Sequence, residues 1–179
     1  MVIIKYFVHG TTTDNSSHLS TGWLPGELSE KGIMQGIELA HTIKDQHFDV
    51  VFCSDLTRAV ESAKLNFYNR DIEMIRDKRI RECNYGDYNG KDSKLVDYAT
   101  HIDKQFPNGE CLKDVEKRIR DIVDFLKKNY DGKTVAIVAH RAPQLALDVI
   151  TNNKTWEQAL ADDWRKTKSW QPGWEYIIQ

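Results

Sequence analysis

The stretch KTVAIVAH, Lys133 to His140, is the most continuous apolar strand pattern in the sequence, and it decides the fold class. A strand without polar alternation is typical of a parallel sheet that helices cover on both faces. A second β-type run, Val2 to Val8, also ends on a histidine, His9. Because the carboxyl ends of parallel strands meet at one edge of a sheet, we expect His9 and His140 to project into the same crevice.

Helix and strand patterns alternate along the rest of the chain. Ser29 is placed to cap a helix in which Ile33, Ile37, Ala40 and Ile43 recur at helical spacing. The other expected elements are a strand over 48–54, a helix over 56–67, a short strand in IEMIRD, a helix over 110–130, a helix near 142–150, a capping box in TWEQ and an edge strand in WEYII. This alternation predicts an α/β fold, a three-layer α/β/α sandwich with a mostly parallel central sheet.

The length of 179 residues predicts a single domain spanning 1–179. The polar stretch from His9 to Glu27, which contains glycines and Pro25, predicts a long loop, and RECNYGDYNG predicts a second loop. Long loops in compact domains are usually functional, so we expect small lid segments around 15–27 and 88–107.

Charge and cysteine content exclude several classes of function. The formal net charge is -2, so no overall positive field recruits nucleic acid or an anionic membrane. The cysteines are odd in number and form no C-x-x-C pair, and the remaining histidines, His18, His41, His47 and His101, show no metal-ligand spacing. We therefore expect a soluble cytoplasmic monomer or homodimer that needs no metal or cofactor.

Two further side chains complete a candidate site. Arg58 begins a helix after the strand that ends near Ser54, and helix amino-terminal amides favour an anion. Glu82, in RECNYG, supplies a carboxyl group for proton transfer, although Asp87 in the same stretch is an alternative. Each residue alone has an ordinary structural explanation, such as a loop cap or a surface charge. Two imidazoles, a guanidinium, amide donors and one carboxyl together indicate phosphoryl transfer.

Six motifs occur in the order found in the histidine phosphatase superfamily, which contains the cofactor-dependent phosphoglycerate mutases. They are VHGTTTDN, GELSEKGIMQG, CSDLTRAVESA, RECNYGDYNG, FPNGECLKDVEKRI and VAIVAH. The chain resembles this family from about residue 2 to residue 140. The resemblance implies a phosphoglycerate mutase-like fold and a reaction on a small phosphorylated substrate.

The resemblance also assigns roles to individual residues. It implies that His9 attacks phosphorus and becomes a phosphohistidine, and that Glu82 protonates the leaving oxygen. The phosphate-binding residues that it implies, together with the neighbouring groups of the first motif, are Arg58, Asn15, His140, Gly10 and Thr12.

The first motif departs from the family pattern, because Val8 stands where the family has a phosphate-binding arginine. A charge-assisted contact of this kind contributes roughly 1.5–3 kcal/mol, so its absence should cost about ten- to a hundredfold in activity. A second departure is Arg141, which follows His140 where the family usually has glycine. Arg141 either restores the missing positive charge or points to solvent at the start of a helix.

These departures leave several functions open. The leading hypothesis is a phosphatase that hydrolyses a small phosphomonoester, because a short chain leaves water free access to the phosphoenzyme. The alternatives are a catalytically impaired relative that binds a phosphorylated ligand or partner, a phosphoglycerate mutase-type phosphotransferase and a phosphatase acting on protein phosphohistidine. Four tryptophans near the carboxyl terminus either wall a substrate pocket or pack a terminal helix on the sheet; they are Trp156, Trp164, Trp170 and Trp174.

Overall fold

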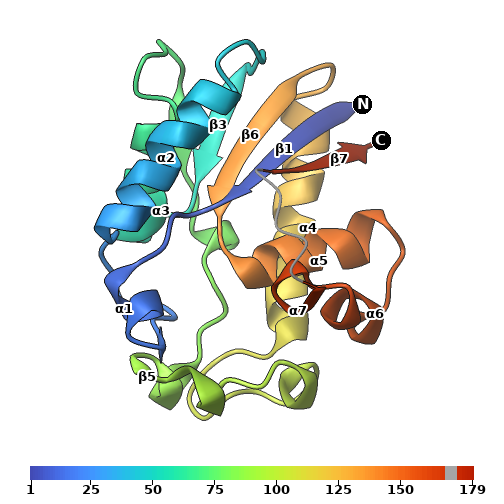
Figure 1. The fold of residues 1–179 in the computed structure, drawn as a ribbon. Helices are drawn as coiled ribbons and strands as arrows, with labels where there is room; N and C mark the ends of the chain where they lie inside the picture. Colours follow the sequence, from blue (N-terminus) through green and yellow to red (C-terminus); the bar gives the residue numbers. More distant parts are fainter. Residues whose placement is uncertain (168–172) are drawn as a thin grey trace.

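A five-stranded sheet forms the centre of the computed structural model, which describes residues 1–167 and 173–179 (Figure 1). The strand order is β4-β3-β6-β1-β7. Neighbouring strands are parallel except β7, which pairs antiparallel with β1 at the sheet edge. The strand bounds are β1 (Val2–Val8), β3 (Val50–Cys53), β4 (Met74–Arg76), β6 (Thr134–Ala139) and β7 (Trp174–Ile178). The predicted mostly parallel sheet is confirmed.

Helices cover both faces of this sheet (Figure 1). One face carries α2 (Glu30–Thr42) and α3 (Thr57–Asn66), and the other carries α4 (Leu112–Asn129) and α5 (Arg141–Thr151). The shorter helices are α1 (Thr13–Ser16), α6 (Trp156–Ala161) and α7 (Trp164–Thr167), with 3-10 turns η1 (Lys78–Ile80), η2 (Gly86–Tyr88), η3 (Ser93–Leu95) and η4 (Ala99–His101). Within the described ranges, no helix combines the length and the apolar character needed to cross a bilayer.

Side chains alternate between the two faces along the central strands. In β1, Ile4 and Tyr6 join the core beneath α4 and α5, whereas Phe7 joins the core beneath α2 and α3. In β6, Ile137 and Val138 divide in the same way. Both sides of these strands are therefore buried, which explains their continuous apolar sequence.

The predicted apolar stripe of α2 is wrong at its first position, because Ile33 is 41% exposed. Gly32 and Gly36 are buried in that helix instead. A Cβ atom on Gly32 would lie 2.1 Å from the carbonyl oxygen of Thr11, and one on Gly36 would lie 2.8 Å from the Cβ of Leu65. The helix faces its neighbours through glycines because their backbones approach too closely for any side chain.

The two stretches expected to form lids contact each other. Strand β2 (Leu19–Ser20) pairs antiparallel with β5 (Lys91–Asp92), so parts of 15–27 and 88–107 form a two-stranded ribbon. The expectation of an irregular loop after His9 is wrong in part, because α1 and β2 lie within it. The ribbon lies apart from the main sheet (Figure 1).

Candidate active site

His9 stands immediately beyond the carboxyl end of β1. Its backbone N–H donates to the carbonyl of Ala139 at 3.0 Å, which extends the pairing between β1 and β6 by one bond. Its ring Nδ1 lies 2.7 Å from the carbonyl oxygen of Gly10. A carbonyl oxygen can only accept, so Nδ1 carries the hydrogen and Nε2 holds the free lone pair. The imidazole is therefore fixed in the tautomer that a nucleophile acting through Nε2 requires.

The backbone around Gly10 is held by the first turn of α2. A Cβ atom on Gly10 would lie 2.5 Å from the carbonyl oxygen of Gly32. The amide of Gly10 donates to the hydroxyl of Ser62 at 3.0 Å. This amide is thus committed to α3, and the role of Gly10 in the structure is to allow close packing beside His9.

Arg58 is the second residue of α3, which places its side chain beside His9. The residue is only 2% exposed. Its Nε lies 3.3 Å from Nε2 of His9. The other guanidinium nitrogens donate to the carbonyl oxygens of Gly22 at 2.8 Å and Leu24 at 3.0 Å. Arg58 therefore joins His9 to the loop that precedes α2, and its predicted phosphate-binding role stays a prediction.

His140 follows β6 and is completely buried. Its backbone is held by Tyr6, whose hydroxyl donates to the His140 carbonyl at 2.7 Å and lies 3.0 Å from the His140 amide. The ring centroids of His9 and His140 are 5.1 Å apart. Within residues 1–167 and 173–179, neither ring nitrogen of His140 has a hydrogen-bond partner. Buried polar atoms are normally satisfied, so these nitrogens indicate a place for a ligand.

Both imidazoles are held in the neutral form. Burial and then the charge of Arg58 lower the pKa of His9 from 6.5 to about 3. Burial, Arg58 and His9 likewise lower the pKa of His140 well below its usual value. A neutral imidazole has a free lone pair on Nε2, and His9 keeps this form in mildly acidic solution.

The lowered pKa of His9 makes the protein lose stability in acid. The unfolded chain takes up this proton near pH 6.5 and the folded chain only near pH 3, so the stabilisation is complete above 6.5 and is lost as pH falls towards 3. We expect the free energy of unfolding to fall by about 2–4 kcal/mol from this residue over that interval. Urea titrations at several pH values would measure the fall.

The matched comparison uses His9→Gln and, as a control, the exposed His47→Gln. Carboxylates also contribute to acid unfolding, so the difference between variants isolates the histidine. The His9→Gln curve should be flatter than those of the unmodified protein and of His47→Gln. Identical slopes in all three proteins would contradict the assigned pKa.

Glu82 faces the same region from the segment after η1. Its side chain is buried and accepts hydrogen bonds from the backbone amides of Cys83, Arg141 and Ala142 at 2.9, 3.2 and 3.0 Å. The hydroxyl of Tyr98 lies 3.3 Å from the same carboxylate. The alternative carboxyl, Asp87, is exposed and accepts from Asn108. Between the two carboxyls, the structure therefore brings Glu82 to the site.

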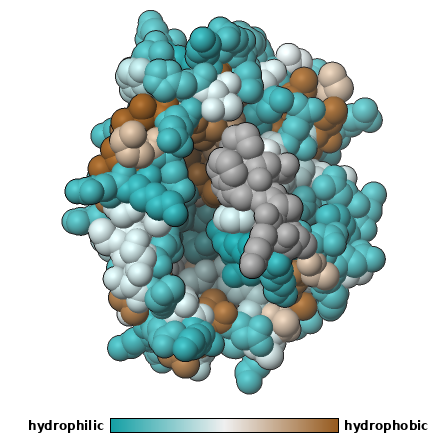
Figure 2. Space-filling model, in the orientation of Figure 1, coloured by the Kyte–Doolittle hydropathy of each residue, from teal (hydrophilic) through white to brown (hydrophobic). Residues whose placement is uncertain are grey.

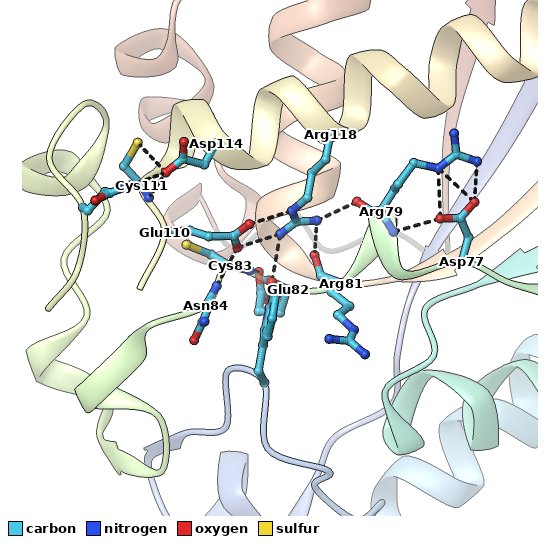
Figure 3. A network of polar contacts seen from close by, with 12 residues as sticks. Asp77, Arg79, Arg81, Glu82, Cys83, Asn84, Glu110, Cys111, Asp114 and Arg118 are labelled. Carbon is cyan, nitrogen blue, oxygen red and sulfur yellow. Dashed lines mark hydrogen bonds and ion pairs between the residues drawn. The ribbon is translucent and has the colours of Figure 1, made fainter. Parts of the chain in front are cut away.

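Arg118, which sequence reasoning missed, fixes the segment that carries Glu82 (Figure 3). It extends from α4 and donates to the backbone carbonyls of Arg79, Arg81 and Glu82 at 2.6, 2.6 and 2.9 Å. It also pairs with Glu110 at 3.0 Å. A single guanidinium thus holds three backbone carbonyls of this short segment. Nothing in the local sequence distinguishes Arg118 from the other basic residues of an amphipathic helix.

A cavity of about 1060 Å³ opens beside these residues. Figure 2 shows the hollow in this face of the molecule, with mostly hydrophilic residues on its rim. Its wall includes Val8, His9, Arg58, Glu82, Arg141 and Arg165. His9, Arg58 and Glu82 thus lie on one cavity. His140 is in contact distance of His9 but is fully buried and does not line the cavity, so the expectation that both histidines project into it holds for His9 alone.

The remaining predicted phosphate ligands have different outcomes. Asn15 lines the cavity, and its Oδ1 accepts from the Thr12 amide, which leaves Nδ2 as the atom that can donate. Thr12 is fully buried and caps α1 by accepting from the Asn15 amide, so Thr11 rather than Thr12 lines the cavity. Arg141 lines the cavity but pairs with Asp163, and its guanidinium lies 4.4 Å from the Tyr98 ring. It does not simply point to solvent.

The tryptophans divide between the two expected roles. Trp156 is buried and donates to Glu116 at 2.8 Å, which is a packing role. Trp164 lines the cavity, with Trp174 at 6.1 Å between ring centroids. Trp170 lies outside the described residues.

No cluster suited to a metal ion is found in the part of the chain that the structure describes. No group of three or more histidine, cysteine or acidic side chains is placed to hold one. The positive charge on the cavity wall comes from three arginines, Arg58, Arg141 and Arg165, and from Lys31.

Comparison with known proteins agrees with the fold and with the order of the motifs. The family model for the histidine phosphatase superfamily (branch 1) matches residues 7–168. The chain is 30% identical to a 2,3-bisphosphoglycerate-dependent phosphoglycerate mutase from Allorhizobium ampelinum over 170 residues, covering 86% of this chain and 81% of the relative. Identity is 28% over 136 residues to phosphoserine phosphatase 1 from Hydrogenobacter thermophilus, covering 70% and 64% of the two chains.

Solved structures show the same fold. The alpha-ribazole phosphatase from Shigella flexneri aligns with a TM-score of 0.81 at 22% identity, covering 89% of this chain and 84% of that chain. A mycobacterial glucosyl-3-phosphoglycerate phosphatase aligns with a TM-score of 0.81 at 24% identity, covering 89% and 86%. Together with the matched family model, these similarities show that the chain belongs to the histidine phosphatase superfamily.

Proposed function

We propose that the protein hydrolyses small phosphomonoesters through a phosphohistidine formed on His9. The observation that carries this proposal is the state of His9, a neutral imidazole with Nδ1 held by Gly10 and Nε2 directed at Arg58. Membership of a superfamily whose relatives include phosphatases and mutases supports phosphoryl transfer. The positive groups at the cavity are suited to the charge on phosphoryl oxygens, so the reaction is proposed to need no metal.

The first step forms the phosphoenzyme. The Nε2 lone pair of His9 attacks phosphorus, and the bond between phosphorus and the ester oxygen breaks. Arg58 already lies beside Nε2, where a phosphoryl oxygen would replace the ring as its partner. The ring of His140 lies 5.1 Å from that of His9 between centroids, and its nitrogens have no partner within residues 1–167 and 173–179. The leaving oxygen takes a proton from Glu82, which enters this step protonated.

The second step returns the enzyme to its starting state. Glu82, now a carboxylate, removes a proton from water, and the water oxygen attacks phosphorus as the bond to His9 breaks. Phosphate leaves, His9 regains its lone pair and Glu82 is again protonated. Hydrogen bonds from the amides of Cys83 and Ala142 to Oε1 hold the Glu82 side chain in place for both proton transfers.

Turnover of p-nitrophenyl phosphate and of a panel of sugar phosphates, without added metal, tests this function. Rapid quenching in alkaline denaturant followed by mass spectrometry at alkaline pH would detect the phosphohistidine, whose P–N bond survives alkali and is lost in acid. Absence of both phosphate release and phosphoenzyme, in this protein and in Val8→Arg, would contradict the proposal.

Val8→Arg is expected to raise kcat/KM by about tenfold. Val8 lines the cavity and pairs with Ala139 in the sheet, so an arginine at this position would extend towards His140. One added charge-assisted contact contributes roughly 1.5–3 kcal/mol, part of which offsets crowding with the arginines already present. The matched control is Val8→Met, which has a long side chain without charge. An equal response in both variants would show that charge at residue 8 does not limit activity.

A mutase reaction is the second candidate, and the 30% identity to a phosphoglycerate mutase favours it. Mutase action returns the phosphoryl group to a second hydroxyl of the substrate, whereas hydrolysis releases it to water. Isomerisation of 3-phosphoglycerate without phosphate release would favour the mutase.

A further inference from the structure

The position of Val8 identifies where a replacement cation would have to act. Val8 packs with the core beneath α4 and α5, and its sheet partner is Ala139, which directly precedes His140. A side chain from residue 8 therefore enters the cavity on the side of α5. Any group that supplies the missing positive charge should line the cavity from this side.

Two arginines occupy this side, joined by one carboxylate. Asp163 has a fully buried side chain, and its Oδ2 accepts from Arg141 at 2.7 Å for Nε and 2.5 Å for Nη2. Its Oδ1 accepts from the backbone amide of Arg165 at 3.1 Å, whereas the Arg165 guanidinium lies at 3.9 Å. Asp163 thus forms hydrogen bonds with the Arg141 side chain and with the Arg165 backbone. Its contact with the Arg165 guanidinium is a longer ion pair.

The Arg165 side chain is oriented by its neighbour and reaches the cavity. Its guanidinium lies 4.2 Å from the ring of Trp164, and both residues line the cavity with His9. The side chain is 35% exposed, so an anion entering the cavity can reach it. The indole N–H of Trp164 is buried and has no partner within residues 1–167 and 173–179.

The three side chains of this cluster carry a net positive charge, which the carboxyl group of Glu82 offsets in part at Arg165. Arg141 and Arg165 carry two positive charges, and Asp163 carries one negative charge. Burial, followed by the charge of Arg141, lowers the pKa of Arg165 from its ordinary value. The charge of Arg165 also contributes to the lowered pKa of His9, after burial and Arg58. An anion bound between Arg165 and His9 would relieve this repulsion.

We propose that Arg165, positioned by Asp163 and Trp164, binds the phosphate group of the substrate in place of the arginine that Val8 replaces. Arg141 helps indirectly, because it occupies Oδ2 of Asp163 and leaves the Arg165 guanidinium available. The inference rests on the proposed function in one respect, namely that the ligand at His9 is a phosphoryl group.

Binding of inorganic phosphate, measured by calorimetry at constant ionic strength, tests this assignment without turnover. Arg165→Gln is expected to weaken phosphate binding by about ten- to a hundredfold. The matched control is the adjacent Lys166→Gln, which changes net charge equally and should weaken binding by less than about twofold. Arg165→Lys keeps the positive charge but loses the planar guanidinium that can donate two parallel hydrogen bonds. Its affinity for phosphate should therefore lie between those of Arg165→Gln and the unmodified protein. Unchanged melting temperatures would show that each variant is folded.

The decisive comparison repeats Arg165→Gln in the Val8→Arg background. There the loss should shrink to less than about threefold, because residue 8 again supplies the contact. Equal effects of Arg165→Gln and Lys166→Gln would overturn the assignment, as would an undiminished loss in the Val8→Arg background.

Turnover and phosphate binding, measured separately, distinguish the role of Arg165 from the proposed hydrolysis. Weakened phosphate binding in Arg165→Gln, with no turnover in the unmodified protein, would retain the site and reject hydrolysis. Normal turnover with unaltered phosphate binding in Arg165→Gln would retain hydrolysis and reject the role of Arg165.

Discussion

His9→Gln is expected to lower kcat for p-nitrophenyl phosphate by on the order of 10⁴-fold or more, because it removes the only atom proposed to bond to phosphorus. Glutamine keeps a polar side chain of similar reach but has no nucleophilic lone pair on a ring nitrogen. The phosphoenzyme trapped by alkaline quenching should vanish with the activity. Binding of inorganic phosphate should persist, because Arg58 and His140 remain in place.

Two controls accompany this variant. His101→Gln changes a histidine that lies outside the cavity and should retain activity within about twofold of the unmodified protein. Circular dichroism should show that His9→Gln is folded. Phosphate release by His9→Gln above about one per cent of the unmodified rate would exclude His9 as the nucleophile. Detection of a phosphoenzyme in this variant would exclude it as well.

Arg58→Gln is expected to lower kcat/KM by about 10²–10³-fold, because a buried guanidinium facing the reacting oxygens acts mainly on the transition state. The same change should reduce the free energy of unfolding by about 1–3 kcal/mol. Arg58 donates to the carbonyls of Gly22 and Leu24, and these acceptors lose their partner when it is replaced. The reduction is moderate because burial lowers the pKa of Arg58, so its charge is itself costly to bury.

Arg58→Lys distinguishes the proposed role of Arg58 in the reaction from its role in holding the backbone of the preceding loop. Lysine keeps a positive charge near His9 but cannot donate to two carbonyls and a phosphoryl oxygen together. We expect partial activity and a stability close to that of Arg58→Gln. The control is Arg120→Gln, which removes an exposed arginine paired with Glu116 on α4. A stability loss without any loss of kcat/KM in Arg58→Gln would make Arg58 a structural residue only.

The convergence of His9, Arg58 and His140 could be predicted from the sequence. Each follows a strand with a strong apolar pattern, and parallel strands place their carboxyl ends at one edge. The sequence does not decide between Glu82 and Asp87 as the proton-transfer carboxyl, because both lie in the same glycine-containing stretch. Burial of one carboxyl and exposure of the other depend on how the loop packs against α5, which sequence spacing does not determine.

Other parts of the site could not be predicted. Thr11 lines the cavity in place of the predicted Thr12, and Ile33 is exposed although a buried position was predicted. Both differences depend on the rotation of a turn or a helix by a single residue. Arg118 contacts a segment far away in the sequence, and Arg165 lines the same cavity as the distant His9; no local pattern records either placement. Such contacts become visible only when the packing of α4 and α7 is known.

The pairing of Val8 with Ala139 has a consequence for how this site can diverge. The two histidines follow directly on neighbouring strands, so their separation is set by the spacing between hydrogen-bonded strands, about 4.8 Å. The ribbon of β2 and β5 contributes Leu19 and Ser20 to the cavity wall but takes no part in that spacing. Mutations there can change which molecule enters without moving the reacting groups, so natural variation in substrate should accumulate in the ribbon while the strands stay constant.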